Sequence, residues 1–289
     1  MIYVEDEPFW ASPMVIKSSV YPRIVLLLLV LLCAMACSSA RSDRVRGGKA
    51  VDPAGAVFVL CYHAFLDIPH DMTFPLRQLD LQLETLKNAG FNFITTEDFI
   101  AKRYRGKNNI LITIDDANKS VYRAYFEVFK KYNIKPLLAI SPGYITRHYT
   151  LSWEEIIELH KEGCFIAAHG YDHLYLDELS YRNNPALSAN EITKSKEVLE
   201  SKLNTKIEVF VYPYGERCAE AIRLLKETGY TFGFTVDWGV VDNADTRFNR
   251  FEVPRYLLLN SNVHEIFAIL FDAIGKTYVP NPQLRFPPR

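Results

Sequence analysis

The sequence lacks a long hydrophobic segment, a block of like charge and a regular cysteine pattern, and each absence excludes a class of protein. Its longest apolar run covers residues 24–36, whereas a membrane-spanning helix needs about 20 apolar residues, so a membrane-spanning transporter is excluded. Its 33 basic and 34 acidic residues give a net charge of -1, which argues against nucleic acid as a partner. Its five cysteines are scattered and imply no disulfide framework.

The composition otherwise fits a globular protein of the α/β class. The chain has 289 residues, 49% of them hydrophobic, which is enough for one large α/β domain or two smaller ones. Aromatic residues make up 13%. They can stack on sugar rings, but core packing is the expected use of most of them.

Residues 1–36 are predicted to be a signal-peptide region. Lys17 and Arg23 precede the apolar run 24–36, as an export signal requires. The acidic residues before them do not suit such a signal, so translation is expected to start at Met14.

The end of this region resembles a bacterial lipobox. Residues 34–37 read AMAC, which predicts a lipidated Cys37; the alternative is an ordinary signal peptide cleaved nearby. The polar stretch 37–56 is expected to be a flexible tether. Residues 57–280 form the expected catalytic domain, and residues 281–289 a C-terminal tail.

Apolar runs alternate with helical patterns through the expected domain. Strands apolar along their whole length, each followed by a helix, indicate a parallel sheet covered on both faces. Seven or eight such units favour a distorted (β/α)7-8 barrel, with an open doubly wound sheet as the alternative. The expected strands are 57–63, 92–96, 110–116, 135–142, 164–169, 208–215, 230–238 and 254–261, and the main helices are 74–90, 121–133, 152–163, 188–204, 218–229 and 263–275.

Two polar motifs stand at carboxyl ends of expected strands, where α/β folds form their active sites. Asp115 and Asp116 are adjacent, and His169 and His173 are four residues apart. One carboxylate and two imidazoles can bind a divalent ion, while the second carboxylate remains free to act as a general base. The competing interpretation is that Asp116 caps the following helix.

Three motifs in order resemble the polysaccharide deacetylases of carbohydrate esterase family 4, also called the NodB-homology fold. The usual TFDDG is TIDDA at 113–117, the usual H-S/T-x-x-H is HGYDH at 169–173, and the third motif is VYPYGE at 211–216. The resemblance covers residues 57–275 and implies a barrel of the NodB-homology type.

The resemblance also implies roles for individual residues. It makes Asp115 the general base and makes Asp116, His169 and His173 the metal ligands, with Zn²⁺ the expected ion and Co²⁺ or Ni²⁺ as alternatives. The backbone N–H of Tyr214 would then bind the oxyanion. Expected substrate-binding residues are Tyr212, Pro213 and Trp238.

The sequence departs from the family pattern at two places. Many members have an arginine shortly before the Pro-Tyr pair that orients the base; none stands there, and Arg255 is a hypothesis for its replacement. The histidine that protonates the leaving amine is also missing from its usual strand, where Asn260 stands. His264 and His63 are the two candidates for that acid.

The sequence therefore predicts an exported, membrane-anchored lipoprotein that removes N-acetyl groups from N-acetylglucosamine units of peptidoglycan or an exopolysaccharide. One alternative is a hydrolase of another amide. The other is a glycan-binding lipoprotein that has lost catalysis.

Overall fold

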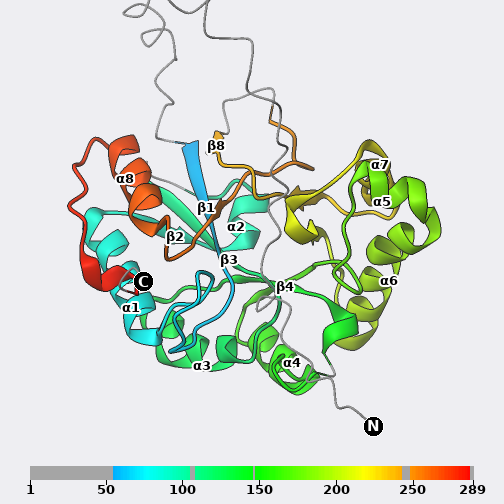
Figure 1. Cartoon of the computed structure of the whole chain (residues 1–289), viewed down its shortest axis with the longest axis horizontal. Coiled ribbons are helices and arrows are strands. Elements are labelled where there is room, and N and C mark those ends of the chain that lie inside the picture. The colour runs from blue at the N-terminus through cyan, green and yellow to red at the C-terminus, as the bar shows by residue number, and fades with distance from the viewer. Residues whose placement is uncertain (1–54, 105–107, 146, 243–247, 287–289) are drawn as a thin grey trace, which may run out of the picture. The chain divides into compact units, whose positions relative to one another are not determined.

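One mixed sheet forms the centre of the computed structural model, which describes residues 55–104, 108–145, 147–242 and 248–286 (Figure 1). The predicted signal region, Cys37 and residues 37–54 of the predicted tether lie outside this described part. Within it, no helix combines the length and apolar character needed to cross a bilayer. The strands of the sheet are β1 (Ala56–Tyr62), β2 (Asn92–Ile94), β3 (Asn109–Ile114), β4 (Leu137–Ile140), β5 (Phe165–Ala168), β6 (Val209–Val211), β7 (Phe232–Phe234), β8 (Val241–Asp242) and β9 (Tyr256–Leu257).

The strand order is β7-β6-β5-β4-β3-β1-β8, with β2 paired to β3 and β9 paired to β1. Every pairing between these strands is parallel except that of β1 with β8. Each predicted strand overlaps an observed one; β1 and β3 begin one residue earlier than predicted, and every observed counterpart except β1 is shorter than its prediction. The two-residue strand β8 was not predicted, because two residues carry no periodic pattern.

The segment before and within β9 links β7, at one end of this sheet, to β1. The N–H of Thr235 donates to Val253 O at 2.9 Å, and the N–H of Val253 donates to Gly233 O at 2.8 Å, which joins the segment to β7. Five residues later, the N–H of Leu258 donates to Cys61 O at 2.9 Å, which joins it to β1. The sheet therefore curves into a distorted barrel, as predicted, rather than remaining an open sheet.

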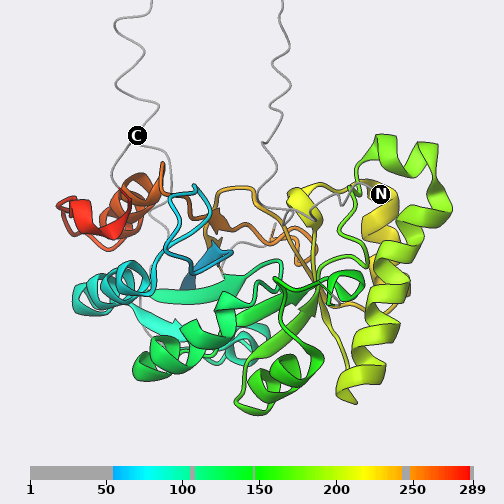
Figure 2. The same cartoon turned by 60° about the horizontal axis from the view of Figure 1, so that its bottom comes forward.

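Helices lie around the outside of the curved sheet (Figures 1 and 2). A capping box starts α4: the Ser152 hydroxyl accepts the Glu155 N–H, and the Glu155 side chain accepts the Ser152 N–H. The short helices α2 and α5 were not predicted. The helices are α1 (Leu76–Ala89), α2 (Thr96–Ile100), α3 (Ser120–Glu127), α4 (Trp153–Lys161), α5 (Glu178–Asn183), α6 (Pro185–Leu203), α7 (Ala219–Glu227) and α8 (Val263–Ala273).

Alternation along the strands separates two hydrophobic cores. On β1, Phe58 and Leu60 belong to the core that also contains the buried residues of α1, α3, α4 and α6, so they point outward toward the helices. Val57 and Val59 belong to a second core built almost wholly from strand residues. Because side chains of a strand point alternately to opposite faces, this second core fills the barrel interior.

The C-terminal segment corrects the predicted domain limit. Residues 281–289 were predicted to be a tail, but the 3₁₀ turn η6 (Pro282–Leu284) contacts α1. Leu284 is fully buried, and Gln82 Nε2 donates to its carbonyl oxygen at 2.6 Å. The folded domain therefore continues past residue 280 to Phe286 at least.

Candidate metal centre

The predicted polar residues converge at the carboxyl ends of β3 and β5, together with Arg255, which directly precedes β9. Asp115 continues the inward-facing alternation of Leu111 and Thr113 on β3. His169 continues that of Ala167 on β5. Both side chains therefore lie above the interior core, at the mouth of the barrel. Parallel strands bring their carboxyl ends to one edge, which explains why residues 54 positions apart meet there.

A buried ion pair holds Asp115. Arg255 Nη1 and Nη2 each donate to one Asp115 carboxylate oxygen at 2.8 Å, and Arg255 Nε donates to Thr235 O at 2.7 Å. Both side chains are buried. Burial alone would raise the pKa of Asp115, but the Arg255 guanidinium and His169 outweigh it, so this pKa lies well below its ordinary value. Asp115 is therefore ionised and fixed in direction.

Asp116 points elsewhere because the chain turns after β3. Asp116 and Ala117 have φ angles of 70° and 49°, in the left-handed region. The Asp116 carboxylate thereby reaches two imidazoles instead of the arginine. The helix-capping alternative does not apply to it, since Asn118 Oδ1 accepts the Ser120 N–H at 3.0 Å at the start of α3.

Asp116, His169 and His173 form a cluster with metal-ligand geometry. Asp116 Oδ1 lies 3.5 Å from His169 Nε2 and 3.2 Å from His173 Nε2, and the two Nε2 atoms are 3.1 Å apart. Ligand atoms about 2.0–2.2 Å from a tetrahedral ion are separated by about 3.3–3.5 Å. The observed separations are close to that spacing, so the three residues fit a divalent cation.

The tautomer of His169 also suits a metal ligand. Its Nδ1 lies 2.8 Å from Val211 O, so Nδ1 donates to that carbonyl and Nε2 is the ring nitrogen that faces Asp116. Burial lowers the pKa of His173, which favours the neutral form that a ligand needs. Arg255 neutralises Asp115, so one uncompensated negative charge, that of Asp116, remains for a cation.

His63 follows β1 at the edge of this cluster. Its Nε2 lies 4.0 Å from Asp116 Oδ2, and its side chain is 12% exposed. Its Nδ1 is buried and has no hydrogen-bond partner among the described residues. Cys61 is fully buried, and its thiol donates to Asp115 Oδ2 at 3.4 Å. The alternation that points Cys61 inward on β1 was the available signal for this contact.

His264, the other candidate acid, is not brought to the cluster by any contact in the described part of the chain. It lies on α8, with Nδ1 2.7 Å from Tyr278 Oη and its ring beside the Tyr278 ring. Asn260 has a structural use instead: its Nδ2 donates to His70 O at 2.8 Å and to Thr73 O at 2.7 Å. Of the two candidates for the acid, His63 is therefore the one that lies beside the cluster.

The third motif divides into buried and accessible residues. Tyr212 was predicted to bind substrate, but it points into the outer core, is fully buried, and donates its hydroxyl to Phe251 O at 3.1 Å. That prediction is wrong because residue 212 faces outward by alternation. Pro213 is buried close to Gly170. Tyr214 has a φ of 60°, and its ring contacts the His173 ring edge to face at 4.8 Å.

Aromatic rings not predicted from the sequence surround the cluster. Tyr175, 48% exposed, stacks on Tyr214 with ring centroids 3.8 Å apart. The Tyr144 ring lies 6.3 Å from the His173 ring. The predicted Trp238 is 45% exposed and contacts Tyr256. Exposed rings beside a polar centre can pack against a substrate.

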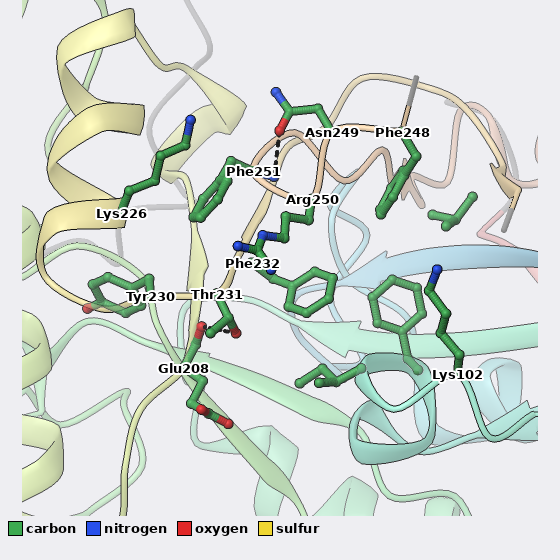
Figure 3. Close-up of a pocket in the computed structure, with 13 residues that line it drawn as sticks. Lys102, Glu208, Lys226, Tyr230, Thr231, Phe232, Phe248, Asn249, Arg250 and Phe251 are labelled. Carbon is green, nitrogen blue, oxygen red and sulfur yellow. Dashed lines mark hydrogen bonds between the residues drawn. The ribbon is translucent and has the colours of Figure 1, made fainter. Parts of the chain in front are cut away.

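A separate cavity lies at the opposite ends of the strands. It has a volume of about 850 Å³ and is lined by residues at the starts of β6 and β7, among them Glu208 and Phe232 (Figure 3). Lys226 and Arg250 also line it, and both lie over the Phe251 ring. None of the cluster residues lines this cavity, so it is not the site of the chemistry described above.

Comparison with known sequences gives a consistent set of relatives. A family model described as polysaccharide deacetylase matches residues 102–233. A poly-beta-1,6-N-acetyl-D-glucosamine N-deacetylase of Staphylococcus aureus is 25% identical over 197 residues, covering 63% of this chain and 66% of that protein. The Bacillus subtilis protein YxkH is 24% identical over 185 residues, covering 63% and 64%. The chain thus spans just under two thirds of the length of these curated relatives.

Solved structures share the fold. IcaB from Ammonifex degensii is 28% identical with a TM-score of 0.66, and the match covers 75% of this chain and 97% of that one. The Streptococcus pyogenes deacetylase PplD, solved with acetate, is 20% identical with a TM-score of 0.63, covering 71% and 93%. The predicted NodB-type fold is confirmed by these matches.

Proposed function

Because a polysaccharide deacetylase family model matches residues 102–233 and similar proteins carry that name, we propose that the chain belongs to this family and is a metal-dependent hydrolase. It removes N-acetyl groups from N-acetylglucosamine units of a cell-wall or surface polysaccharide. The observation that carries the proposal is the Asp116–His169–His173 cluster beside an ionised carboxylate that is not part of it. A ligand set and a separate base are the two parts that hydrolysis by an activated water requires.

Asp116, His169 and His173 would hold the ion, with Zn²⁺ the first choice and Co²⁺ or Ni²⁺ as alternatives. When bound, the ion would polarise the acetyl carbonyl and make a water more acidic. The Val211 carbonyl fixes the direction of His169 Nε2. Asp116 supplies the negative charge that offsets part of the charge of the ion.

Asp115 is the proposed general base. Its carboxylate oxygen Oδ2 lies 3.8 Å from His169 Nε2, so it stands beside the ligand set without joining it. Arg255 holds both carboxylate oxygens, which fixes their direction but makes Asp115 a weak base. Asp115 can therefore accept a proton only from a water that is unusually acidic, which is why the base and the ion must act together.

His63 is the proposed general acid that donates a proton to the sugar nitrogen as acetate leaves. It is preferred over His264 because its Nε2 lies 4.0 Å from Asp116 Oδ2, whereas His264 contacts Tyr278. The backbone N–H of Tyr214 is proposed to bind the oxyanion. Trp238 remains a proposed substrate contact, while Tyr212 and Pro213 are withdrawn because both are buried.

The proposed substrate is an N-acetylated exopolysaccharide, with peptidoglycan as the other candidate glycan. The Staphylococcus aureus relative is named for poly-beta-1,6-N-acetyl-D-glucosamine, and IcaB, at 28% identity, shares the fold over nearly its whole length. We propose that the protein is exported and anchored to the membrane through lipid on Cys37, which would put it beside such a polymer.

Acetate release from poly-β-1,6-N-acetylglucosamine oligomers, measured with and without a chelator, tests the proposal. Release that stops with the chelator and returns with Zn²⁺, Co²⁺ or Ni²⁺ is expected. Acetate release that is indifferent to the chelator would refute metal dependence. Glycan binding without any acetate release under each metal would favour the non-catalytic alternative.

A further inference from the structure

A buried glutamate on α6 holds the loop that carries His173. Glu191 is only 1% exposed, and its carboxylate accepts the Asp172 N–H at 2.9 Å and the Leu174 N–H at 2.9 Å. These two amides flank His173 in the chain. A single carboxylate therefore fixes the backbone on both sides of one proposed metal ligand.

Gly170 leaves the room that this carboxylate occupies. A Cβ atom at position 170 would lie 2.5 Å from Glu191 Oε2 and 3.1 Å from the Pro213 side chain. Gly170 also has a φ of 73°, in the region that glycine adopts most easily. Glycine at position 170 therefore leaves space for the Glu191 carboxylate and adopts the positive φ found at this position.

The loop also has a conformation that it would not adopt unaided. His173 has a φ of 53°, which is uncommon for a residue other than glycine and costs free energy unless its surroundings enforce it. On the side of the short helix η4 (Pro142–Tyr144), the Gly143 N–H donates to Tyr171 O at 2.9 Å. Gly143 and Glu191 thus hold the loop from two elements, η4 and α6.

We propose that Glu191 is a positioning residue for metal binding: its carboxylate holds the loop 170–174 so that His173 Nε2 meets Asp116 and His169. The inference rests on the proposed function, since it takes the three residues as metal ligands. Without the carboxylate, the N–H groups of the half-buried residues Asp172 and Leu174 lose their acceptor, and the left-handed conformation of His173 loses its support. Residues that orient metal ligands typically contribute about 10–100-fold to metal affinity.

The test is the affinity of the purified protein for Zn²⁺, measured by competition with a chromophoric chelator, together with the unfolding temperature of the metal-free form. We expect Glu191→Ala to weaken Zn²⁺ binding about 10–100-fold. Glu191→Gln keeps the shape and one acceptor oxygen, so it should weaken binding by a smaller factor. Gly170→Ala, which pushes a methyl group against Glu191, should weaken binding although Glu191 itself is retained.

Glu200→Gln is the matched control on the same helix. Glu200 Oε1 accepts the Ile207 N–H at 2.9 Å and pairs with Lys196 at 2.8 Å, away from the His173 loop. Its substitution should lower the unfolding temperature and leave Zn²⁺ affinity within about 2-fold of the wild type.

Two outcomes would overturn the inference and can be told apart. If wild type binds Zn²⁺ and both Glu191 variants bind it equally well while unfolding at a lower temperature, Glu191 only stabilises the fold. If wild type binds no divalent ion, the proposed metal centre is wrong, and this inference is wrong with it.

Discussion

At the residue scale, the site depends on two adjacent aspartates that face different partners. The inward alternation of β3 carries Asp115 to Arg255, and the left-handed turn at Asp116 carries that carboxylate to His169 and His173. The sequence predicted separate roles for the two carboxylates, one beside the imidazoles and one free of them. It could not predict which histidine approaches the site, since nothing local shows that His264 meets Tyr278.

Asp115 and Arg255 should behave as a unit in catalysis. Asp115→Asn should lower kcat about 10²–10⁴-fold, the usual contribution of a general base. Arg255→Lys keeps the charge but loses the two-pronged hydrogen bond, so it should lower kcat about 10-fold or more. In the Asp115→Asn background, Arg255→Lys should cost little further activity. Acetate-release kinetics of wild type, the two single variants and the double variant test this expectation. Fully additive losses of activity would contradict coupling between Asp115 and Arg255.

The same pair should make stability depend on pH. Asp115 has a folded-state pKa below its unfolded value of about 3.9, so its contribution is present above about pH 4 and is lost as pH falls below it. For the metal-free protein, the difference in unfolding free energy between wild type and Asp115→Asn should therefore shrink by about 1 kcal/mol from pH 5 to pH 3. Urea unfolding of both proteins at several pH values measures this difference in unfolding free energy. A difference that does not change with pH would contradict a lowered folded-state pKa for Asp115.

The two candidate acids can be separated by substitution. His63→Gln should lower kcat about 10²–10⁴-fold, as expected for a general acid, and should leave the Zn²⁺ content unchanged. His264→Gln should leave kcat within about 2-fold, because its contacts are with Tyr278. If acetate release falls strongly for His264→Gln and not for His63→Gln, the roles are reversed.

At the element scale, the apolar runs predicted the strands of the barrel well, but their ends poorly. The predicted strands extended into the polar residues that follow them; β3, for example, ends at Ile114, before the aspartates. Residues at these ends turn away from the ladder to form the site. The predicted helix 121–133 is broken, with α3 ending at Glu127 and a 3₁₀ turn (Phe129–Tyr132) following it. Tertiary packing sets such breaks, and helical periodicity alone does not reveal them.

Asn260 should contribute to the stability of the fold and not to metal binding or catalysis. It links the residues after β9 to the loop after β1 through His70 O and Thr73 O, and its Oδ1 accepts the Phe286 N–H at 2.9 Å. Asn260→Ala should lower the unfolding free energy by about 1–3 kcal/mol, because hydrogen-bonding groups lose their partner. Urea unfolding and Zn²⁺ titration check this, and unchanged stability with weakened Zn²⁺ binding would contradict it.

At the scale of the whole molecule, the apolar residues packed inside the barrel support the polar residues at the carboxyl ends of its strands. Thr113, Asp115 and His169 follow the last apolar residues of the interior core. The buried side chains of Asp115 and His169 therefore lie directly above well-packed strand residues. The fold class, the clustering of Asp116 with His169 and His173, and the contact of Arg255 with Asp115 could all be anticipated from the sequence. Glu191 and Tyr175 could not, because their contacts depend on how α6 and the His173 loop pack together.

The central claim is that Asp116 binds the ion and Asp115 acts on the water. The most direct measurement is metal content together with acetate release for wild type, Asp115→Asn and Asp116→Asn. We predict that Asp115→Asn retains about one divalent ion per chain yet loses nearly all activity, whereas Asp116→Asn loses both. An Asp115→Asn protein that keeps its metal and full activity would contradict the account.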